Sequence, residues 1–403
     1  MKKSCFVFIM MLSAMLIATS VFSQTQKELE EFAKKQQQGI DALKQSQDDE
    51  MLRMQKEYED YVKAEKAAYA AFKKDVENTW GKGNAAESTN KDWVEYSADK
   101  KSRSIVDFES GKATVEVILT DQQAANPQVV EQVVENQVET LLQSKGTTKD
   151  YDTKYEKREP LSTKPVLMGQ VTTPDGKKIE QLPLTKAVKE IVEAAKPQVK
   201  TIKGDDGSVR KVAVFSLALA PDNIKTRAET YKDIVASYSN KYKIEPALVY
   251  ALIQTESSFN PKAKSHVPAY GLMQIVPRYA GKDAYKFVYG NDMTPTSNYL
   301  YEPKNNIELG IAYMHMLINR SFGKVNDENC RMLCSIAAYN TGAGNVSRTF
   351  IKSTNLPKAI PEINKYSYDE LYNYMYAKLP AQETRNYIKK VTERMAQYKN
   401  WIQ

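Results

Sequence analysis

One carboxylate in this sequence stands where it could serve as an acid. Glu256 ends an apolar run that includes Leu248, Leu252 and Ile253 at helical spacing, and Pro261 disfavours helix a few residues later. The end of a helix and apolar neighbours both favour the protonated form of a carboxyl group. A general acid needs that form near neutral pH, so Glu256 is a candidate catalytic acid. Taken alone, a Glu in this position is more often a solvated or capping residue.

The residues that follow Glu256 strengthen the case, because hydroxyl, amide and small side chains recur in a fixed order. The set comprises Glu256-Ser257, Ser265, Gly271-Leu272-Met273-Gln274, Ala338-Tyr339-Asn340 and Tyr387. This order resembles the lytic transglycosylase family, whose catalytic domain has a goose-type-lysozyme-like fold. The resemblance covers residues 222–403.

The resemblance implies a reaction as well as a fold. Glu256 would be the single general acid and base that cleaves the bond between N-acetylmuramic acid (MurNAc) and N-acetylglucosamine (GlcNAc) in peptidoglycan. The product would be a 1,6-anhydro sugar, and no water would be consumed. The saccharide would be bound by Ser257, Ser265, Tyr270, Gly271, Met273, Gln274, Tyr339, Asn340 and Tyr387. For Met273, simple core packing explains the residue nearly as well.

Two other functions compete with this one. A true hydrolase on the same fold, a lysozyme or chitinase, would need a second carboxylate, and Asp283, Glu302 and Glu308 are interpreted as structural or solvated. An inactive peptidoglycan-binding scaffold would not need the set around Glu256. No cofactor or metal is expected, because the two histidines, His266 and His315, lack ligand-like partners.

A long helix is predicted for residues 24–79. This segment is rich in Glu, Lys, Gln and Ala, and apolar residues recur at spacings of three and four, among them Leu43, Met54 and Phe72. The stripe could pack on the protein's own domain. Equally, it could form a homo-oligomer, bind a protein partner or act as a spacer.

Residues 80–220 alternate between strand and helix signals. Strands are predicted at 102–108, 112–119, 166–171, 177–182 and 209–219, and helices at 129–144 and 184–195. The residues Trp80-Gly81, Ser102-Arg103-Ser104, Asp107-Phe108-Glu109-Ser110-Gly111 and Gly169-Gln170-Val171 resemble the amino-terminal domain of the transglycosylase C branch of the same family. Arg103 and Asp107 are expected to form a salt bridge.

Residues 221–403 are predicted to be helical almost throughout. Helices are expected at 224–242 with Asp222 as the cap, from Glu245-Pro246 to Glu256, at 305–319, at 333–339 and at 382–398. The predicted fold class is therefore α+β: an all-helical lysozyme-like catalytic domain, preceded by a smaller α+β domain and a long N-terminal helix.

Residues 1–23 predict a secretory signal peptide, with Lys2 and Lys3 before an apolar core at 6–17. An uncleaved anchor is the alternative. The protein is expected to be exported to the periplasm or cell envelope, without a membrane span in the mature chain. Cys5 lies inside the signal and no cysteine stands near Gln24, so no lipobox is seen.

The remaining composition agrees with this setting. The net charge of +7 suits an anionic polymer such as peptidoglycan, although it would also suit nucleic acid or anionic lipid. No nucleic-acid motif is present, and no nucleic-acid partner is expected. Cys330 and Cys334 are four residues apart on a predicted helix, where disulfide geometry is poor, so two free buried thiols are expected.

Overall fold

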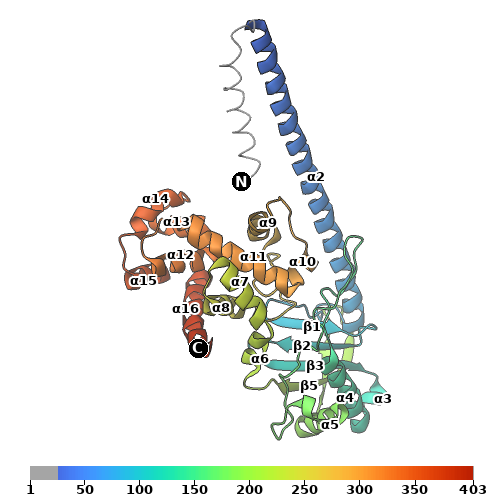
Figure 1. Ribbon diagram of the computed structural model, residues 1–403. Coiled ribbons are helices and arrows are strands. Elements are labelled where there is room, and N and C mark those ends of the chain that lie inside the picture. The colour runs from blue at the N-terminus through green and yellow to red at the C-terminus, as the bar shows by residue number, and fades with distance from the viewer. Residues whose placement is uncertain (1–25, 403) are drawn as a thin grey trace. The chain divides into compact units, whose positions relative to one another are not determined.

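The computed structural model describes residues 26–402, so the predicted signal peptide at 1–23 lies outside the described residues. The chain divides into two compact units between Lys63 and Ala64. Helix α2 (Gln26–Trp80) begins in the first unit and ends in the second, which confirms the predicted long N-terminal helix (Figure 1). The helix stops at Gly81, whose φ of 88° lies in the left-handed region that glycine adopts readily.

The predicted apolar stripe of α2 has two different environments. In the first unit Leu43 is 66% exposed and Met54 36% exposed, whereas Tyr61, near the end of that unit, is buried. In the second unit Phe72 packs against Val76 and Trp80, which are fully buried. Packing on the protein's own domain therefore accounts for the end of the stripe but not for Leu43 and Met54.

The second unit contains one antiparallel sheet of five strands in the order β1-β2-β3-β5-β4. Its strands are β1 (Asp92–Tyr96), β2 (Ser102–Asp107), β3 (Lys112–Leu119), β4 (Gln198–Lys203) and β5 (Val209–Ala218). Side chains alternate between the two faces of a strand. In β5, Phe215 therefore joins the core beneath α4 and α5, whereas Val212 joins Val76 and Trp80 of α2.

Two helices cover one face of the sheet, α4 (Pro127–Gln143) and α5 (Leu184–Ala195) (Figure 1). Asn126 begins α4 as its N-cap, since its side chain accepts a hydrogen bond from the Gln128 amide. The short α3 (Asp121–Ala124) and the 3₁₀ helix η1 (Ile179–Gln181) complete this part.

The structure corrects several predictions in the sheet region. The hairpin predicted at 166–171 and 177–182 is absent from the described residues, apart from an isolated bridge between Thr172 and Lys178. Strands β1 and β4 were not predicted. Arg103 pairs with Glu116, its neighbour across β2 and β3, at 2.5 Å and not with Asp107. Two residues four apart on one strand are too far from each other, whereas cross-strand neighbours lie about 5 Å apart.

Helices form almost all of the chain after residue 222. They are α6 (Asn223–Thr230), α7 (Lys232–Tyr242), α8 (Pro246–Ser257), α9 (Lys282–Tyr289), α10 (Ser297–Tyr301), α11 (Pro303–Met316), α12 (Glu328–Thr341), α13 (Ala343–Ile351), α14 (Leu356–Ile363), α15 (Tyr368–Lys378) and α16 (Gln382–Ile402), with π-helical turns η2 (Pro277–Gly281) and η3 (Leu317–Ser321). The single helix predicted at 224–242 is broken at Tyr231, and the Asp222 side chain makes no capping hydrogen bond.

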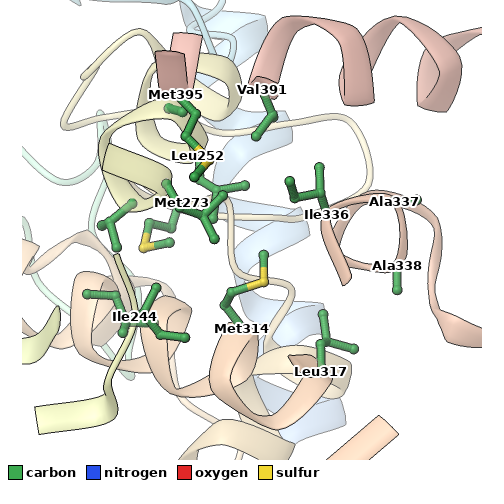
Figure 2. Close-up of a cluster of buried hydrophobic side chains, with 14 of the residues drawn as sticks. Ile244, Leu252, Met273, Met314, Leu317, Ile336, Ala337, Ala338, Val391 and Met395 are labelled. Atoms are coloured by element: carbon green, nitrogen blue, oxygen red, sulfur yellow. The ribbon is translucent and has the colours of Figure 1, made fainter. Parts of the chain in front are cut away.

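The core of this helical part gathers around α8. Figure 2 shows Leu252 of α8, Met314 of α11 and Val391 of α16 converging on Met273. Helix α8 carries apolar side chains on nearly every side, and both α16 and α7 pack against it. Cys330 and Cys334 of α12 are buried free thiols, as predicted.

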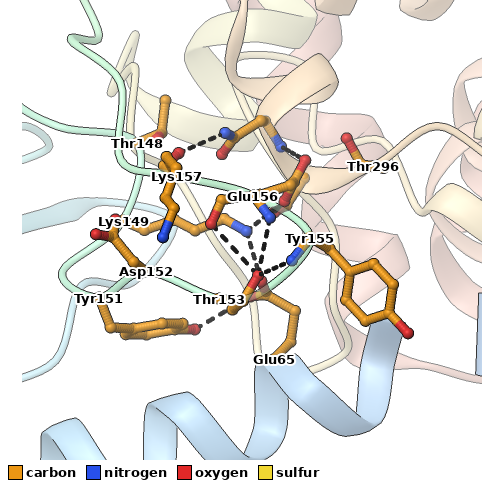
Figure 3. A network of polar contacts seen from close by, with 12 residues as sticks. Glu65, Thr148, Lys149, Tyr151, Asp152, Thr153, Tyr155, Glu156, Lys157 and Thr296 are labelled. Carbon is orange, nitrogen blue, oxygen red and sulfur yellow. Dashed lines mark hydrogen bonds and ion pairs between the residues drawn. The ribbon is translucent and has the colours of Figure 1, made fainter. Parts of the chain in front are cut away.

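Buried ion pairs hold parts of the second unit together. Lys149 bonds to Glu65 of α2 at 2.5 Å and also to Glu156 (Figure 3). Glu156 in turn accepts hydrogen bonds from Ser297 Oγ and the Asn298 amide of α10, both at 3.2 Å. The network joins the end of α2, the 148–157 segment and the start of α10. Across residues 26–402, no helix has both the length and the apolar character needed to cross a membrane.

Candidate active site

Glu256 lies in the last turn of α8, with its carboxyl group against α16. The hydroxyl of Tyr387 in α16 donates to Glu256 Oε1 at 2.6 Å. Burial raises the pKa of Glu256 to about 7, while the Tyr387 hydrogen bond and the charge of Lys91 act in the lowering direction. The charge of Glu383 adds to the rise. A carboxyl group with such a pKa exists in both protonation states near neutral pH.

Two tyrosines flank this carboxyl group, the buried Tyr387 and the partly buried Tyr339. Burial, together with the charge of Glu256, raises the pKa of Tyr387 and of Tyr339 well above the ordinary value. Both phenols therefore stay neutral and act as donors. Tyr387 donates to Glu256, and Tyr339 donates to the Met273 carbonyl at 2.9 Å.

The turn at residues 271–275 packs beside α8 and depends on a glycine. Gly271 has φ of 75°, and an added Cβ would lie 2.3 Å from the Leu300 carbonyl oxygen. The buried Asn306 holds the turn: its Nδ2 donates to the carbonyls of Tyr270 and Leu300, and its Oδ1 accepts from the Met273 amide at 2.7 Å. Residues 271–274 thus form a tight turn, bridged between Tyr270 and Ile275.

Gln274 follows in the same turn with φ of 49°, in the left-handed region. Its Nε2 donates to the Gly271 carbonyl at 2.9 Å, while its Oε1 is buried without a hydrogen-bond partner among the described residues. That oxygen is an acceptor for which residues 26–402 supply no donor. A ligand hydroxyl or amide could supply one.

Two of the predicted saccharide-binding side chains, those of Ser257 and Met273, are fully buried. Ser257 is fully buried, and its hydroxyl lies within hydrogen-bond distance of the carbonyls of Ile253 and Leu272, at 3.0 and 2.8 Å. Met273 is also fully buried, in the core shown in Figure 2, where its thioether faces Gly310. Both side chains hold the 271–275 turn against the protein, so core packing is the better explanation of Met273.

Ser265 and Tyr270 line a separate pocket of about 520 Å³. The end of α2, the 86–90 and 148–151 segments and the 262–270 loop form its walls. Tyr270 meets the ring of Tyr301 edge to face at 5.6 Å. Ser265 Oγ donates to the Val267 carbonyl and accepts from the Ala269 amide, so it shapes the loop.

Asn340 occupies the junction of α12 and α16. Its Oδ1 accepts a hydrogen bond from Thr384 Oγ1 at 2.7 Å, one turn of α16 before Tyr387. The structure thus brings Glu256, Tyr387, Tyr339 and Met273 into one connected group, with Asn340 attached through α16. Ser265 and Tyr270 belong to the neighbouring pocket.

The sequence did not point to several residues that build this site. Lys91 and Asn90, which precede β1, reach the carbonyl end of α8, and Asn306 holds the 271–275 turn. Nothing in their local sequence marks them, because each acts on residues far away in the chain. Among residues 26–402, no group of three His, Cys, Asp or Glu could hold a metal ion.

Comparisons with known proteins agree with this geometry. Residues 233–360 match the Transglycosylase SLT domain, and residues 44–230 match the N-terminal domain of membrane-bound lytic murein transglycosylase C. A membrane-bound lytic murein transglycosylase C from Sodalis glossinidius is 33% identical over 331 residues, which cover 81% of this chain and 88% of that protein. The chain belongs to this family. It is a lytic murein transglycosylase.

Other members of the transglycosylase C family match over a similar length. The protein of that name from Mannheimia succiniciproducens is 30% identical and covers 81% of this chain and 87% of its own length. The solved 70-kDa soluble lytic transglycosylase from Escherichia coli is 28% identical with a TM-score of 0.33, covering 43% of this chain and 24% of that longer chain. Membership in the family confirms the predicted fold class, a helical lysozyme-like catalytic domain after an α+β domain and a long helix.

Proposed function

We propose that this transglycosylase cleaves the MurNAc–GlcNAc β-1,4 bond without water, with Glu256 as its single general acid and base. The observation that carries the proposal is the Glu256 carboxyl group, whose pKa is about 7 and whose Oε1 accepts the Tyr387 hydroxyl at 2.6 Å. A group that first gives and then takes a proton works best when its pKa lies near the working pH.

The proposed reaction has two halves that share one proton carrier. Protonated Glu256 gives its proton to the glycosidic oxygen, and the C1–O bond breaks as GlcNAc leaves. The acetamido oxygen of MurNAc stabilises the cation at C1. Ionised Glu256 then takes the proton of the C6 hydroxyl, whose oxygen attacks C1 to close the 1,6-anhydro ring. Tyr387 donates to the carboxylate between the two halves, and this favours the first proton transfer.

The saccharide is proposed to contact the members of the predicted set other than Ser257 and Met273. Gln274 has a buried oxygen without a partner among the described residues, and Asn340 and Tyr339 lie on the α12 side of the site. Gly271 allows the backbone to approach the sugar. Ser265 and Tyr270 would act further along, in the neighbouring pocket. Ser257 and Met273 position the turn and are not proposed to touch the ligand.

Mass spectrometry of the products from purified peptidoglycan tests the proposal. Wild-type protein is expected to release anhydro-muropeptides, one water lighter than hydrolysis products, and Glu256→Gln is expected to release none. Glu383→Gln is the matched control, because Glu383 is the other carboxylate whose charge acts on Glu256. We expect it to keep most of the activity.

The same experiment separates the alternatives. Hydrated products from the wild type, or loss of all products with Glu383→Gln, would favour a lysozyme-type hydrolase that uses two carboxylates. Binding of peptidoglycan without any products would favour an inactive scaffold.

The cellular location of the protein and the limits of its domains are further proposals. We propose export to the periplasm or cell envelope, since residues 1–23 predict a signal and peptidoglycan lies outside the cytoplasm. The relatives above are named membrane-bound. The boundaries after residues 23, 79 and 220 stay predictions.

A homo-oligomer or a protein partner at the α2 arm is a separate proposal. Leu43 and Met54 lie on one face of α2, in the apolar stripe, and are 66% and 36% exposed. Light scattering on the full chain and on a Leu43→Glu, Met54→Glu variant would test self-association. A monomeric wild type would leave a protein partner as the remaining proposal.

A further inference from the structure

The last carbonyl groups of α8, the helix that carries Glu256, have no hydrogen-bond donors within the helix. The final C=O groups of any α-helix have no intrahelical partner. In α8 the Gln254 carbonyl is taken by the Ser258 amide and the Ser257 carbonyl by the Asn260 amide. The carbonyl oxygens of Thr255 and Glu256, which lie between them, need donors from elsewhere.

Both donors come from the α+β part, more than 160 residues earlier in the chain. Lys91 Nζ donates to the Thr255 carbonyl at 2.8 Å and also lies 3.0 Å from the Gln254 carbonyl. Asn90 Nδ2 donates to the carbonyl of Glu256 itself at 3.0 Å. The catalytic helix is therefore capped by a segment that precedes β1.

This capping segment is held firmly in place. The fully buried Asn260 donates through Nδ2 to the carbonyls of Thr89 and Asp92, at 3.3 and 3.2 Å. Lys91 Nζ makes a third hydrogen bond, to Ser258 Oγ at 3.1 Å. An ammonium group has three protons, so all of its donors are used at the end of α8.

We propose that Lys91 is a positioning residue for Glu256, through which the α+β part places a positive charge at the end of the catalytic helix. A cation there offsets the negative end of the helix dipole and stabilises a nearby carboxylate. Glu256 becomes a carboxylate only after it has given up its proton, so the charge favours that step. The inference rests on the proposed role of Glu256.

Other charged and titratable groups also act on Glu256 and on Lys91. Glu256 is faced by Tyr387 from α16, by Tyr339 from α12 and by the like charge of Glu383. Lys91 is faced by Glu109, Lys390 and Arg394 as well as by Glu256. Burial lowers the pKa of Lys91 to about 8, which leaves most of the amine charged at pH 7.

A carboxyl titration of Glu256 tests the inference without relying on activity. In protein with ¹³C-labelled Glu, the signal that Glu256→Gln removes is assigned to Glu256. With Lys91→Met, its midpoint is expected to rise by roughly 1 pH unit, as removal of a neighbouring opposite charge should do. The alkaline limb of kcat/KM should move the same way, and kcat should fall by up to roughly 10-fold, the limit that 1 pH unit of acid strength sets when the first proton transfer limits the rate. Lys91→Arg, which keeps the charge, should restore all three.

Lys262→Met is the matched control. Lys262 is a buried lysine that also joins the two parts, because its Nζ bonds to Asp150 at 2.6 Å and donates to the Val94 carbonyl, whereas Lys91 Nζ bonds to the end of α8. This variant should lose thermal stability but keep the Glu256 midpoint. An unchanged midpoint in Lys91→Met, or an equal shift in Lys262→Met, would overturn the inference. If Lys91→Met does not fold, Lys91→Gln gives the same titration readout. Hydrated products from the wild type would instead refute the proposed function and leave the titration result standing.

Discussion

Glu256 should make the protein less stable as the pH rises, and Glu256→Gln should remove that loss. The pKa of Glu256 in the folded protein is about 7, against an ordinary value of 4.5, because burial disfavours the carboxylate. Between these two values the folded state holds a proton that the unfolded chain has already released. Stability therefore falls as the pH rises through this window and is constant above it.

The size of the effect follows from the shift. A difference of about 2.5 pH units corresponds to roughly 3.5 kcal/mol, at about 1.4 kcal/mol for each unit. The amide that Glu256→Gln introduces cannot ionise, but its oxygen can still accept the Tyr387 hydroxyl. The variant and wild type should thus be equally stable at and below pH 4, and the variant should be more stable by about 3.5 kcal/mol at pH 8. That difference is worth roughly 5 °C in melting temperature.

Melting temperatures of both proteins from pH 4 to pH 9 test this prediction. Glu308→Gln is a control for which the opposite change is expected. Burial acts to raise the pKa of Glu308, but hydrogen bonds from Lys241 and Tyr242 lower it below the ordinary value. The Glu308 carboxylate therefore stabilises the folded protein at pH 8, and Glu308→Gln should lower the melting temperature there. A gap between Glu256→Gln and wild type that stays constant with pH would refute the reasoning. So would a variant that melts below wild type at pH 8.

Three further outcomes are expected. Tyr387→Phe should lower kcat roughly 10-fold to 100-fold and move the alkaline limb of kcat/KM upward, because the lost hydrogen bond stabilised the carboxylate; an unchanged pH profile would contradict this. Gly271→Ala should lower the free energy of unfolding in urea by about 3 kcal/mol or more, since the added Cβ would lie 2.3 Å from the Leu300 carbonyl oxygen. An unchanged urea midpoint would show that the 271–275 turn does not require glycine. Cys330 and Cys334 should react with a thiol reagent at pH 8 only after the protein unfolds. Both thiols are buried, and burial raises the pKa of each, that of Cys330 to about 11. Rapid labelling of the native protein would contradict this prediction.

Local sequence patterns were sufficient to predict most of the helices and three of the five strands of the sheet. Asn126-Pro127 marks the start of α4, and Pro246 marks the start of α8, since capping and fixed φ act within a few residues. Strand β4 was missed because its side chains are largely exposed and carry no clear alternation. The helix predicted at 224–242 breaks at Tyr231, which nothing in the apolar spacing reveals.

Some features of the candidate site could likewise be predicted from the sequence, and others only from the structure. An apolar helix followed by a stop indicated Glu256, and the resemblance added Tyr387, 131 residues later, which the structure places in direct contact. Ser257 and Met273 were predicted to bind the saccharide, with core packing as the alternative for Met273, and the structure shows that both side chains are fully buried. Adjacent residues at a helix end or in a turn can point in opposite directions, and packing decides which one faces the core.

The sequence by itself determined the kind of chemistry: one carboxyl group at the end of a buried helix, with donors that follow in a recognisable order. Only the tertiary structure decided what sets the charge state of that carboxyl group. Lys91 lies 164 residues from the carbonyl oxygen it caps, and Tyr387 approaches from a separate helix. The pKa of Glu256 depends on burial and on charges within a few ångströms, and folding brings those together from distant parts of the chain.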